Sequence, residues 1–197
     1  MTDVVVIDHG AGNYASIAHA LRRLGHACTR SADAARIAAA SHVILPGVGA
    51  AGDAMRHLDA GGLTTLIPGL RQPVLGICLG MQLLHEASAE NDVGCLGILP
   101  GRAERLPAGP GLRTPHMGWN TLAVRTGCPL TAGLDAGAYV YFVHSYAVAP
   151  GPSTVAVADY GVTFSALVSR GNFHGAQFHP ERSGVHGSRL LANFLAL

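Results

Sequence analysis

The chain has 197 residues, of which 49% are hydrophobic and only 13% are charged, and its formal net charge is +1. This balance is typical of a folded protein with a full-sized core and argues against disorder. It gives no electrostatic reason to expect binding to nucleic acid or to an anionic membrane. No apolar run approaches the roughly 18 residues of a membrane helix, and the N-terminus lacks the basic start of a signal peptide. We therefore expect a cytoplasmic protein with a single domain over residues 1–197.

Strands and helices alternate in the first half of the sequence. The apolar segments VVVID (4–8), HVILP (42–46) and PVLGIC (73–78) each predict a buried strand, and a helix-like segment follows each of them. In the first of these helices apolar residues recur at helical spacing over 14–24, and Gly25 stands where a C-terminal cap is expected. Alternation of this kind predicts a parallel sheet that is covered by helices on both faces.

The second half of the sequence, from about Gly94 onward, has a different pattern. Short apolar segments broken by Gly and Pro predict antiparallel or mixed strands. These segments are YVYFVHSYAV (139–148), STVAVADY (153–160), FSALVS (164–169) and HGAQFHP (174–180). SRLLANFLAL (188–197) predicts a closing helix. The expected fold is therefore α/β, with a central, mostly parallel sheet flanked by helices and an antiparallel or mixed C-terminal portion.

The segment GICLG (76–80) lies where the third predicted strand meets a helix. Its spacing is that of the G-x-S-x-G nucleophile elbow, with a cysteine sulfur in place of the serine hydroxyl. In such an elbow the nucleophile occupies a sharp, strained turn, and the N–H of the next residue, here Leu79, can stabilise an oxyanion. An isolated cysteine is more often a small buried hydrophobe. Glycines at both offsets, however, favour Cys78 as a nucleophile.

A nucleophilic cysteine needs a base, and the base needs a group that orients it. His179-Pro180-Glu181 offers both within three residues. Proline disfavours helical geometry in the residue before it, so His179 should be extended, and alternate residues of an extended run share a face. Glu181 is therefore expected beside the His179 imidazole. Taken alone, the HPE sequence is better explained as a surface turn with a chance acid.

The glycine-rich segment PGVG (46–49) follows the second predicted strand. Its two glycines allow backbone N–H groups to turn toward a neighbouring strand end, where they can provide a second oxyanion donor. A phosphate-binding loop is the alternative, but the GK[ST] ending of a P-loop is missing. The segment therefore favours an oxyanion site over a phosphate site.

Together, the PGVG, GICLGMQ and QFHPE segments resemble the class I glutamine amidotransferase family, in the family's order and over nearly the whole chain. The resemblance implies an enzyme that hydrolyses the side-chain amide of L-glutamine, with Cys78 as nucleophile, His179 as base and then acid, and Glu181 as its orienting group. It implies oxyanion donors at the backbone of Val48 and Leu79. It also implies that glutamine is held by Gly47, Gly49, Gln82, Glu90 and Ser145. No cofactor is expected, and a metal is disfavoured because the cysteines form no CxxC pair.

Three further segments, DHGAGN (8–13), PHMGWN (115–120) and YFVHSYAV (141–148), resemble the glutaminase subunit of imidazole glycerol phosphate synthase. In that histidine-biosynthesis enzyme, ammonia passes to a (β/α)₈-barrel cyclase subunit. The resemblance implies a heterodimer with such a cyclase, and an ammonia path gated by His144. It implies an interface that includes Asn13, Trp119 and Arg182; the alternative for Trp119 is a core aromatic, and exposure of this side chain would favour the interface.

Two residues depart from the pattern of that subunit, which more often has Tyr or Ser in place of His9 and Lys in place of Arg182. Because guanidinium prefers bidentate partners, the second change can rearrange a contact across the interface. Neither change touches the expected triad. We expect His116 and His174 to be structural or solvated, and the reduced thiols Cys28, Cys95 and Cys128 to be packing residues.

Three alternatives remain open from the sequence. The first is a glutaminase for another synthase, such as the pyridoxal phosphate, anthranilate or GMP systems. The second is a hydrolase or cysteine peptidase that has the same elbow and is active without a partner. The third is a non-catalytic regulatory subunit, which an intact triad disfavours.

Overall fold

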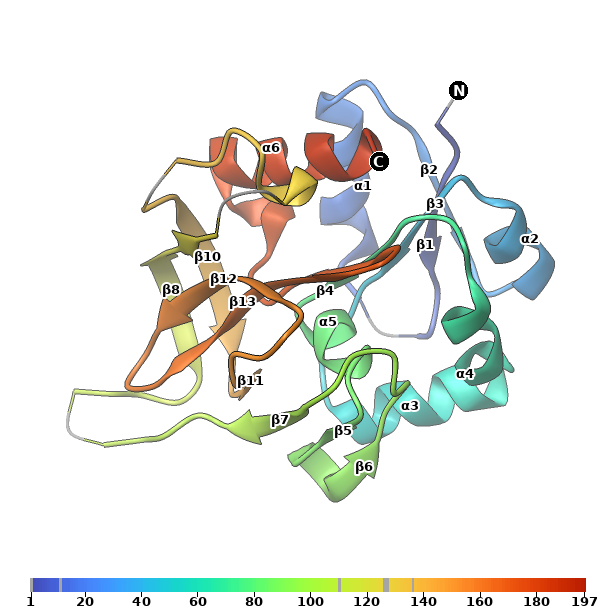
Figure 1. Ribbon diagram of the computed structural model, residues 1–197. Coiled ribbons are helices and arrows are strands. Elements are labelled where there is room, and N and C mark those ends of the chain that lie inside the picture. The colour runs from blue at the N-terminus through green and yellow to red at the C-terminus, as the bar shows by residue number, and fades with distance from the viewer. Residues whose placement is uncertain (1, 11, 110, 126–127, 136) are drawn as a thin grey trace.

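The computed structural model describes residues 2–10, 12–109, 111–125, 128–135 and 137–197 (Figure 1). Its first half consists of β1 (Val4–Ile7), α1 (Tyr14–Arg23), β2 (Cys28–Ser31), α2 (Ala34–Ala39), β3 (His42–Leu45), α3 (Ala51–Ala60), α4 (Leu63–Leu66), the 3₁₀ turn η1 (Ile67–Gly69), β4 (Val74–Ile77) and α5 (Leu79–Leu83). The predicted alternation of strands and helices is confirmed here. The GAGN segment (10–13), whose residues are typical of a turn, includes Ala11, which lies outside the described residues.

The second half is built mainly from strands and short turns. It consists of β5 (Ala87–Ser88), η2 (Glu90–Asp92), β6 (Val93–Gly94), β7 (Arg102–Arg105), β8 (His116–Thr121), β9 (Ala123–Val124), η3 (Pro129–Thr131), β10 (Tyr139–His144), β11 (Tyr146–Val148), β12 (Thr154–Asp159), β13 (Thr163–Arg170), β14 (Phe173–Ala176), η4 (Pro180–Arg182) and α6 (Gly184–Leu195). None of the helices in the described ranges is long and apolar enough to cross a membrane.

Within the described residues, an eight-stranded sheet runs in the order β2-β1-β3-β4-β14-β13-β12-β9. The pairs from β2 to β14 are parallel, and those from β14 to β9 are antiparallel. This confirms the predicted α/β fold with a mixed C-terminal portion. Strand β14 comes from the end of the chain and lies against β4, where Ala176 pairs with Ile77. The segments that follow these two strands, QFHPE and the elbow, therefore leave the sheet at the same edge.

In the described part of the chain, two smaller sheets accompany the central one. Strands β8 and β10 form an antiparallel pair in which Trp119 lies opposite Tyr141. A four-stranded sheet has the order β11-β7-β5-β6. The expected strand over 139–148 is thus divided at Ser145, and its two parts pair with different neighbours.

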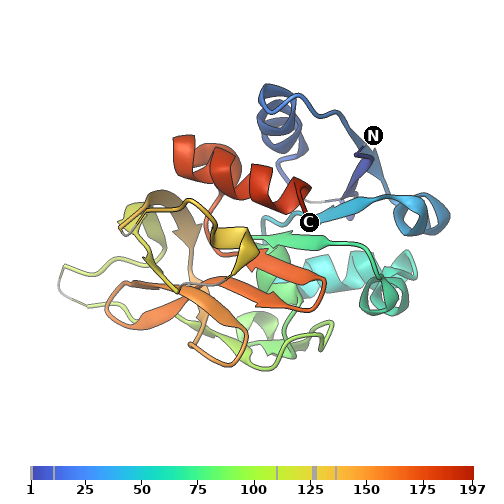
Figure 2. The same cartoon turned by 45° about the horizontal axis from the view of Figure 1, so that its top comes forward.

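The core is divided between the two faces of the central sheet. Consecutive side chains of a strand point to opposite faces, so Val4 and Val6 pack with α1 and α6, whereas Val5 and Ile7 pack with α2, α3 and α4. Figure 2 shows α1 and α6 on one side of the sheet, with α3 and α4 on the other. Burial on both faces explains why these strands are continuous apolar runs rather than alternating ones.

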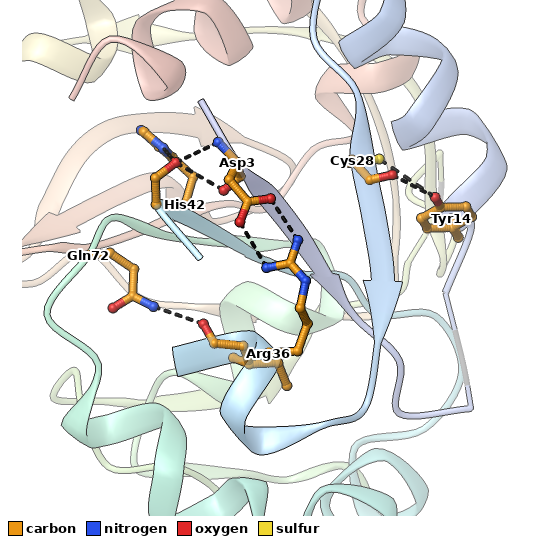
Figure 3. A network of polar contacts seen from close by, with 8 residues as sticks. Asp3, Tyr14, Cys28, Arg36, His42 and Gln72 are labelled. Carbon is orange, nitrogen blue, oxygen red and sulfur yellow. Dashed lines mark hydrogen bonds and ion pairs between the residues drawn. The ribbon is translucent and has the colours of Figure 1, made fainter. Parts of the chain in front are cut away.

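Polar contacts join the residues around the N-terminal end of β1 and around α2 (Figure 3). The Arg36 guanidinium donates to both carboxylate oxygens of Asp3, at 2.8 and 2.7 Å. Ser41 Oγ accepts from the Asp3 N–H at 2.8 Å, and Gln72 Nε2 donates to the Ile37 carbonyl at 3.0 Å. Exposed pairs of this kind contribute little to the free energy of unfolding. The apolar core on both faces of the sheet therefore holds the fold together.

Three elements differ from the sequence-based expectation. The helix-like segment after the third predicted strand, LGMQLLHEAS (79–88), is helical only as far as Leu83, because Ala87–Ser88 instead forms a strand that pairs with β6 and β7. The closing helix begins at Gly184, before the predicted 188, since its first turns contain glycines that hide the helical pattern. No strand was predicted over HMGWN, yet this segment forms strand β8, because β10 pairs with it over its whole length.

Candidate active site

Cys78 occupies the junction between β4 and α5 in a strained conformation, with φ 53° and ψ −110°. A positive φ is uncommon for a residue other than glycine and is found mostly at functional sites. The flanking glycines are sterically required. A Cβ on Gly76 would lie 2.6 Å from the Gly80 carbonyl oxygen, and a Cβ on Gly80 would overlap the Leu45 carbonyl. The sequence around Cys78 therefore builds a tight elbow that leaves the sulfur at the end of β4.

His179 and Glu181 form a buried pair just beyond β14. Nδ1 of His179 lies 2.8 Å from Oε1 of Glu181, and the side chains are only 7% and 1% exposed. His179 is extended as expected, with φ −97° and ψ 96°. The expected route to Glu181 is wrong, however, because Pro180 starts a 3₁₀ turn and not an extended run. This turn curls the carboxylate back onto the imidazole.

The His179–Glu181 contact determines which imidazole nitrogen carries the proton. The carboxylate accepts, so Nδ1 is the donor and Nε2 is left for another partner. Nε2 is buried and has no hydrogen-bond partner among the described residues. Burial acts to lower the pKa of His179, but the nearby Cys78 and Glu181 outweigh it and raise the pKa to about 10. The imidazole is therefore poised to hold a proton beside the sulfur.

A pocket of about 390 Å³ opens over the elbow. The predicted site residues that line it are Val48, Gly49, Cys78, Leu79, Gln82, Glu90, Ser145 and His179, together with Asn13 and Arg182 from the expected interface. Gly47 does not line the pocket. It lies behind the wall, where an added Cβ would come within 2.7 Å of Leu79 Cβ and the Gly80 nitrogen. Glu181 lies behind His179. The structure thus brings residues from both halves of the chain to one cavity.

The carbonyl of Tyr146 anchors a polar network at one wall of this pocket. It accepts from Nε2 of Gln82 and from Nδ1 of His144, each at 2.8 Å. Nε2 of His144 must then be an acceptor, and it receives the Nδ1 proton of His116 at 3.0 Å. Burial lowers the pKa of His144 to about 3 and that of His116 to about 4, so both are neutral. His116 is therefore a buried structural partner of His144 and not a solvated residue.

Glu90 lines the pocket and also caps a helix. Its Oε2 accepts from the Ala51 N–H at 2.9 Å, and Asn91 Oδ1 accepts from the Gly52 N–H at 3.3 Å. Both N–H groups belong to the first turn of α3, where backbone donors lack partners within the helix. Glu90 is therefore held in place by the backbone that follows the PGVG segment.

A family model for class I glutamine amidotransferases matches residues 5–197. The chain belongs to this family. It is 50% identical over 197 residues to the "Imidazole glycerol phosphate synthase subunit HisH" of Xylella fastidiosa, covering 100% of this chain and 98% of the relative. It is 47% identical over 201 residues to the Vibrio cholerae protein of the same name, covering 99% and 98%. A solved glutamine amidotransferase superposes with a TM-score of 0.75 at 21% identity, covering 98% and 97%, which shows the shared fold.

The amidotransferase has an exposed aromatic cluster on the β8–β10 pair. Trp119 is 47% exposed, so it is not a core aromatic, and it stacks on Tyr139 with a centroid distance of 6.0 Å. Met117 beside it is 63% exposed. The Arg182 guanidinium lies 5.7 Å from the centroid of the Tyr141 ring. Large exposed apolar side chains gathered on one face are typical of an interaction surface.

Two contacts of the amidotransferase nucleophile were not predicted from the sequence. The Cys78 thiol donates to the Val143 carbonyl at 3.6 Å, and Gln177 Nε2 lies 3.8 Å from the sulfur. Gln177 stands two residues before His179 within the predicted strand HGAQFHP, so a shared face was a usable signal for it, although the chain bends at Gln177 and Phe178. The Val143 contact joins residues 65 apart and has no local signal.

The other three cysteines of the amidotransferase are free thiols that pack against the core clusters. Burial raises the pKa of Cys95 to about 11 and also raises that of Cys28. Since the thiolate is the reactive form, this makes both residues poor nucleophiles.

Proposed function

We propose that this amidotransferase is the glutaminase subunit of imidazole glycerol phosphate synthase. It hydrolyses glutamine to glutamate and ammonia and passes the ammonia to a cyclase subunit. The observation that carries the chemistry is that the strained elbow of Cys78 and the imidazole of His179 line the same pocket, with Glu181 buried behind His179. The choice of synthase rests on the 50% identity to a relative of that name over the whole chain.

The first half of the reaction forms a thioester. The Cys78 sulfur attacks the carbon of the glutamine side-chain amide, and Nε2 of His179 takes the thiol proton. Glu181 holds the imidazole through Nδ1 and stabilises the imidazolium that results. The N–H groups of Val48 and Leu79 bind the oxyanion, a contact whose loss typically costs about 10²–10³ in rate. His179 then returns the proton to the leaving nitrogen, and ammonia departs.

The second half of the reaction releases glutamate. His179, now neutral, takes a proton from water, and the oxygen attacks the thioester carbon. The carbon–sulfur bond breaks, and the proton goes back to sulfur. The pocket wall supplies the groups that hold the substrate's own charges. Glu90 faces the α-ammonium, while Gly49, Gln82 and the backbone at Ser145 hold the remainder of the substrate backbone.

The partner face is formed by Asn13 and Arg182 at the pocket rim and by Trp119 on β8. Exposed aromatic and arginine side chains of this kind are enriched in interface hot spots. The bound cyclase barrel uses the ammonia to produce imidazole glycerol phosphate and aminoimidazole carboxamide ribotide, with His144 beside the ammonia path. We assign the complex to the cytoplasm, where free thiols stay reduced.

The direct test is the Cys78→Ala variant in a complex reconstituted with a cyclase subunit. We expect glutamine-dependent synthesis to fall to background, because the nucleophile is gone, and synthesis from added ammonia to be retained. Cys95→Ala is the matched control and should keep both activities. Loss of both activities in Cys78→Ala would show that Cys78 supports folding or assembly instead.

Glutamine hydrolysis by the isolated chain distinguishes the proposal from a stand-alone hydrolase. We expect the rate of ammonia release to rise strongly when the cyclase and its ligand are added. Full activity without the partner would favour a hydrolase that has the same elbow.

A further inference from the structure

Gln177 lies behind the nucleophile, and its residue is fully buried. Its Oε1 accepts from Gln82 Nε2 at 3.0 Å, and its Nε2 points to the Cys78 sulfur at 3.8 Å. Its backbone N–H donates to the Ala166 carbonyl at 2.9 Å, which ties this segment to the neighbouring strand β13. Gln177 therefore bridges the nucleophile and a residue that lines the pocket.

The direction of these hydrogen bonds follows from the carbonyl of Tyr146. A glutamine amide keeps its shape when oxygen and nitrogen are exchanged, so the surrounding network must decide its orientation. The Tyr146 carbonyl can only accept, so Gln82 must present its NH₂ group there. The second hydrogen of that NH₂ group faces Gln177 and requires Oε1 of Gln177. The remaining atom of Gln177, which faces the sulfur, must then be the donor Nε2.

The sulfur of Cys78 consequently lies between an acceptor and a donor. The Val143 carbonyl accepts the thiol hydrogen at 3.6 Å, and the Gln177 N–H is donated to the sulfur. When His179 removes the proton, the Val143 carbonyl loses its donor. The Gln177 N–H remains and favours the negatively charged sulfur, because a hydrogen bond donated to an anion stabilises it.

We propose that Gln177 is a catalytic residue that donates its side-chain N–H to the Cys78 sulfur as the sulfur becomes negatively charged. This inference rests on the proposed role of Cys78 as nucleophile. Gln82 then has a second role, because its NH₂ group, which the Tyr146 carbonyl orients, fixes the orientation of the Gln177 amide. The oxygen of Gln82 is left for the pocket that this side chain lines.

The test compares Gln177→Met, which keeps the length of the side chain but removes the donor, with Gln177→Glu, which places a carboxylate against the sulfur. The first readout is the rate of Cys78 alkylation by iodoacetamide in the free chain, mapped by peptide mass spectrometry. We expect Cys78 in both variants to be alkylated about 10- to 100-fold more slowly than in the natural chain, as for the loss of one hydrogen bond to a charged group. In the reconstituted complex, kcat for glutamine should fall by a similar factor, with KM nearly unchanged.

Gln72 provides a matched control, because it is a glutamine whose side chain donates to the Ile37 and Ala38 carbonyls and not to the Cys78 sulfur. Gln72→Met should alkylate at the natural rate. If Gln177→Glu does not fold, Gln177→Met alone decides the question. Unchanged alkylation in a folded Gln177→Met variant would overturn the inference, and so would a change in KM alone, which indicates only a structural role.

The same measurements separate this inference from the proposed function. If Gln177→Met slows alkylation but the natural chain releases no ammonia from glutamine even with a cyclase, the proposed function fails and the N–H···S contact stands. If the natural complex hydrolyses glutamine and alkylation does not respond to Gln177, the proposed function stands and this inference fails.

Discussion

Two buried pairs, each with one histidine in the pocket lining, have histidine pKa values that are shifted in opposite directions. In the first, His179 contacts the Glu181 carboxylate at 2.8 Å, and its pKa is raised to about 10. In the second, His116 contacts His144 at 3.0 Å, and burial lowers their pKa values to about 4 and about 3. All four residues are buried, so burial alone does not explain the difference.

The difference lies in what each pair faces. Removal from water disfavours the charged imidazolium, and a nearby negative charge can reverse this effect. His179 has the Glu181 carboxylate on one side and the Cys78 sulfur near the other nitrogen. His144 faces the neutral carbonyl of Tyr146, which fixes its tautomer but offers no charge. The first pair is therefore suited to carry a proton, and the second to hold the bend at Ser145.

The largest effect should come from Glu181→Gln, which makes the first pair resemble the second. The pKa of His179 should fall well below about 10, because its anionic partner is gone. We expect kcat for glutamine to fall by about 10⁴, as for other triads that lose this carboxylate. Histidine NMR titration and ammonia release in the reconstituted complex measure the two effects. Glu104→Gln, at an exposed carboxylate on β7, is the control and should change neither.

An intermediate effect is expected on stability in acid. The pKa values of His116, His144 and His174 are lowered in the folded state, so the unfolded chain takes up protons first as the pH falls below about 6.5. The free energy of unfolding should therefore decrease from about pH 6.5 toward pH 4, by up to about 1.4 kcal/mol per pH unit for each histidine. His179 has the opposite sign, since its stabilisation is complete below about pH 6.5 and is lost as the pH rises toward about 10.

Urea unfolding at a series of pH values measures this slope. The His174→Leu variant should show a shallower decline in acid than the natural chain, because it removes one lowered pKa outside the pocket. It should keep its glutaminase activity in the complex. An unchanged slope would contradict the assignment of acid sensitivity to the buried neutral histidines.

The smallest effect is expected from Asp3→Asn. This change removes the exposed Asp3–Arg36 ion pair, for comparison with the buried His179–Glu181 pair. The Arg36 guanidinium hydrogen-bonds Asp3 and lowers the pKa of that carboxyl, yet both groups lie in water. Solvent screens such pairs, so the melting temperature should hardly change. A large decrease would show that the end of β1 depends on this contact, and the contrast between buried and exposed carboxylates would fail.

The local features of this protein could be predicted from its sequence. The order of strands and helices follows from runs such as VVVI and HVIL, because burial on both faces requires continuous apolar residues. The G-x-C-x-G spacing predicts a strained elbow, and Cys78 has a φ of 53°. Steric exclusion at Gly76 comes from Gly80 and Met81, a few residues along the chain, so this part of the pattern is local. At Gly80 it comes from Leu45 at the end of the neighbouring strand β3. The proximity of His179 and Glu181 was predicted in the same way, although through the wrong backbone geometry.

Only the tertiary structure decided how these local pieces combine. The contacts that orient the polar groups join residues far apart in the chain: His116 and His144 are separated by 28 residues, Gln82 and Tyr146 by 64, and Cys78 and Gln177 by 99. A hydrogen bond of this kind leaves no periodic pattern in the sequence, because the pairing and packing of the strands determine which residues meet. The pairing of β14 with β4 brings the imidazole to the sulfur. The backbone carbonyl of Tyr146 sets the direction of the hydrogen bonds of Gln82, Gln177 and His144.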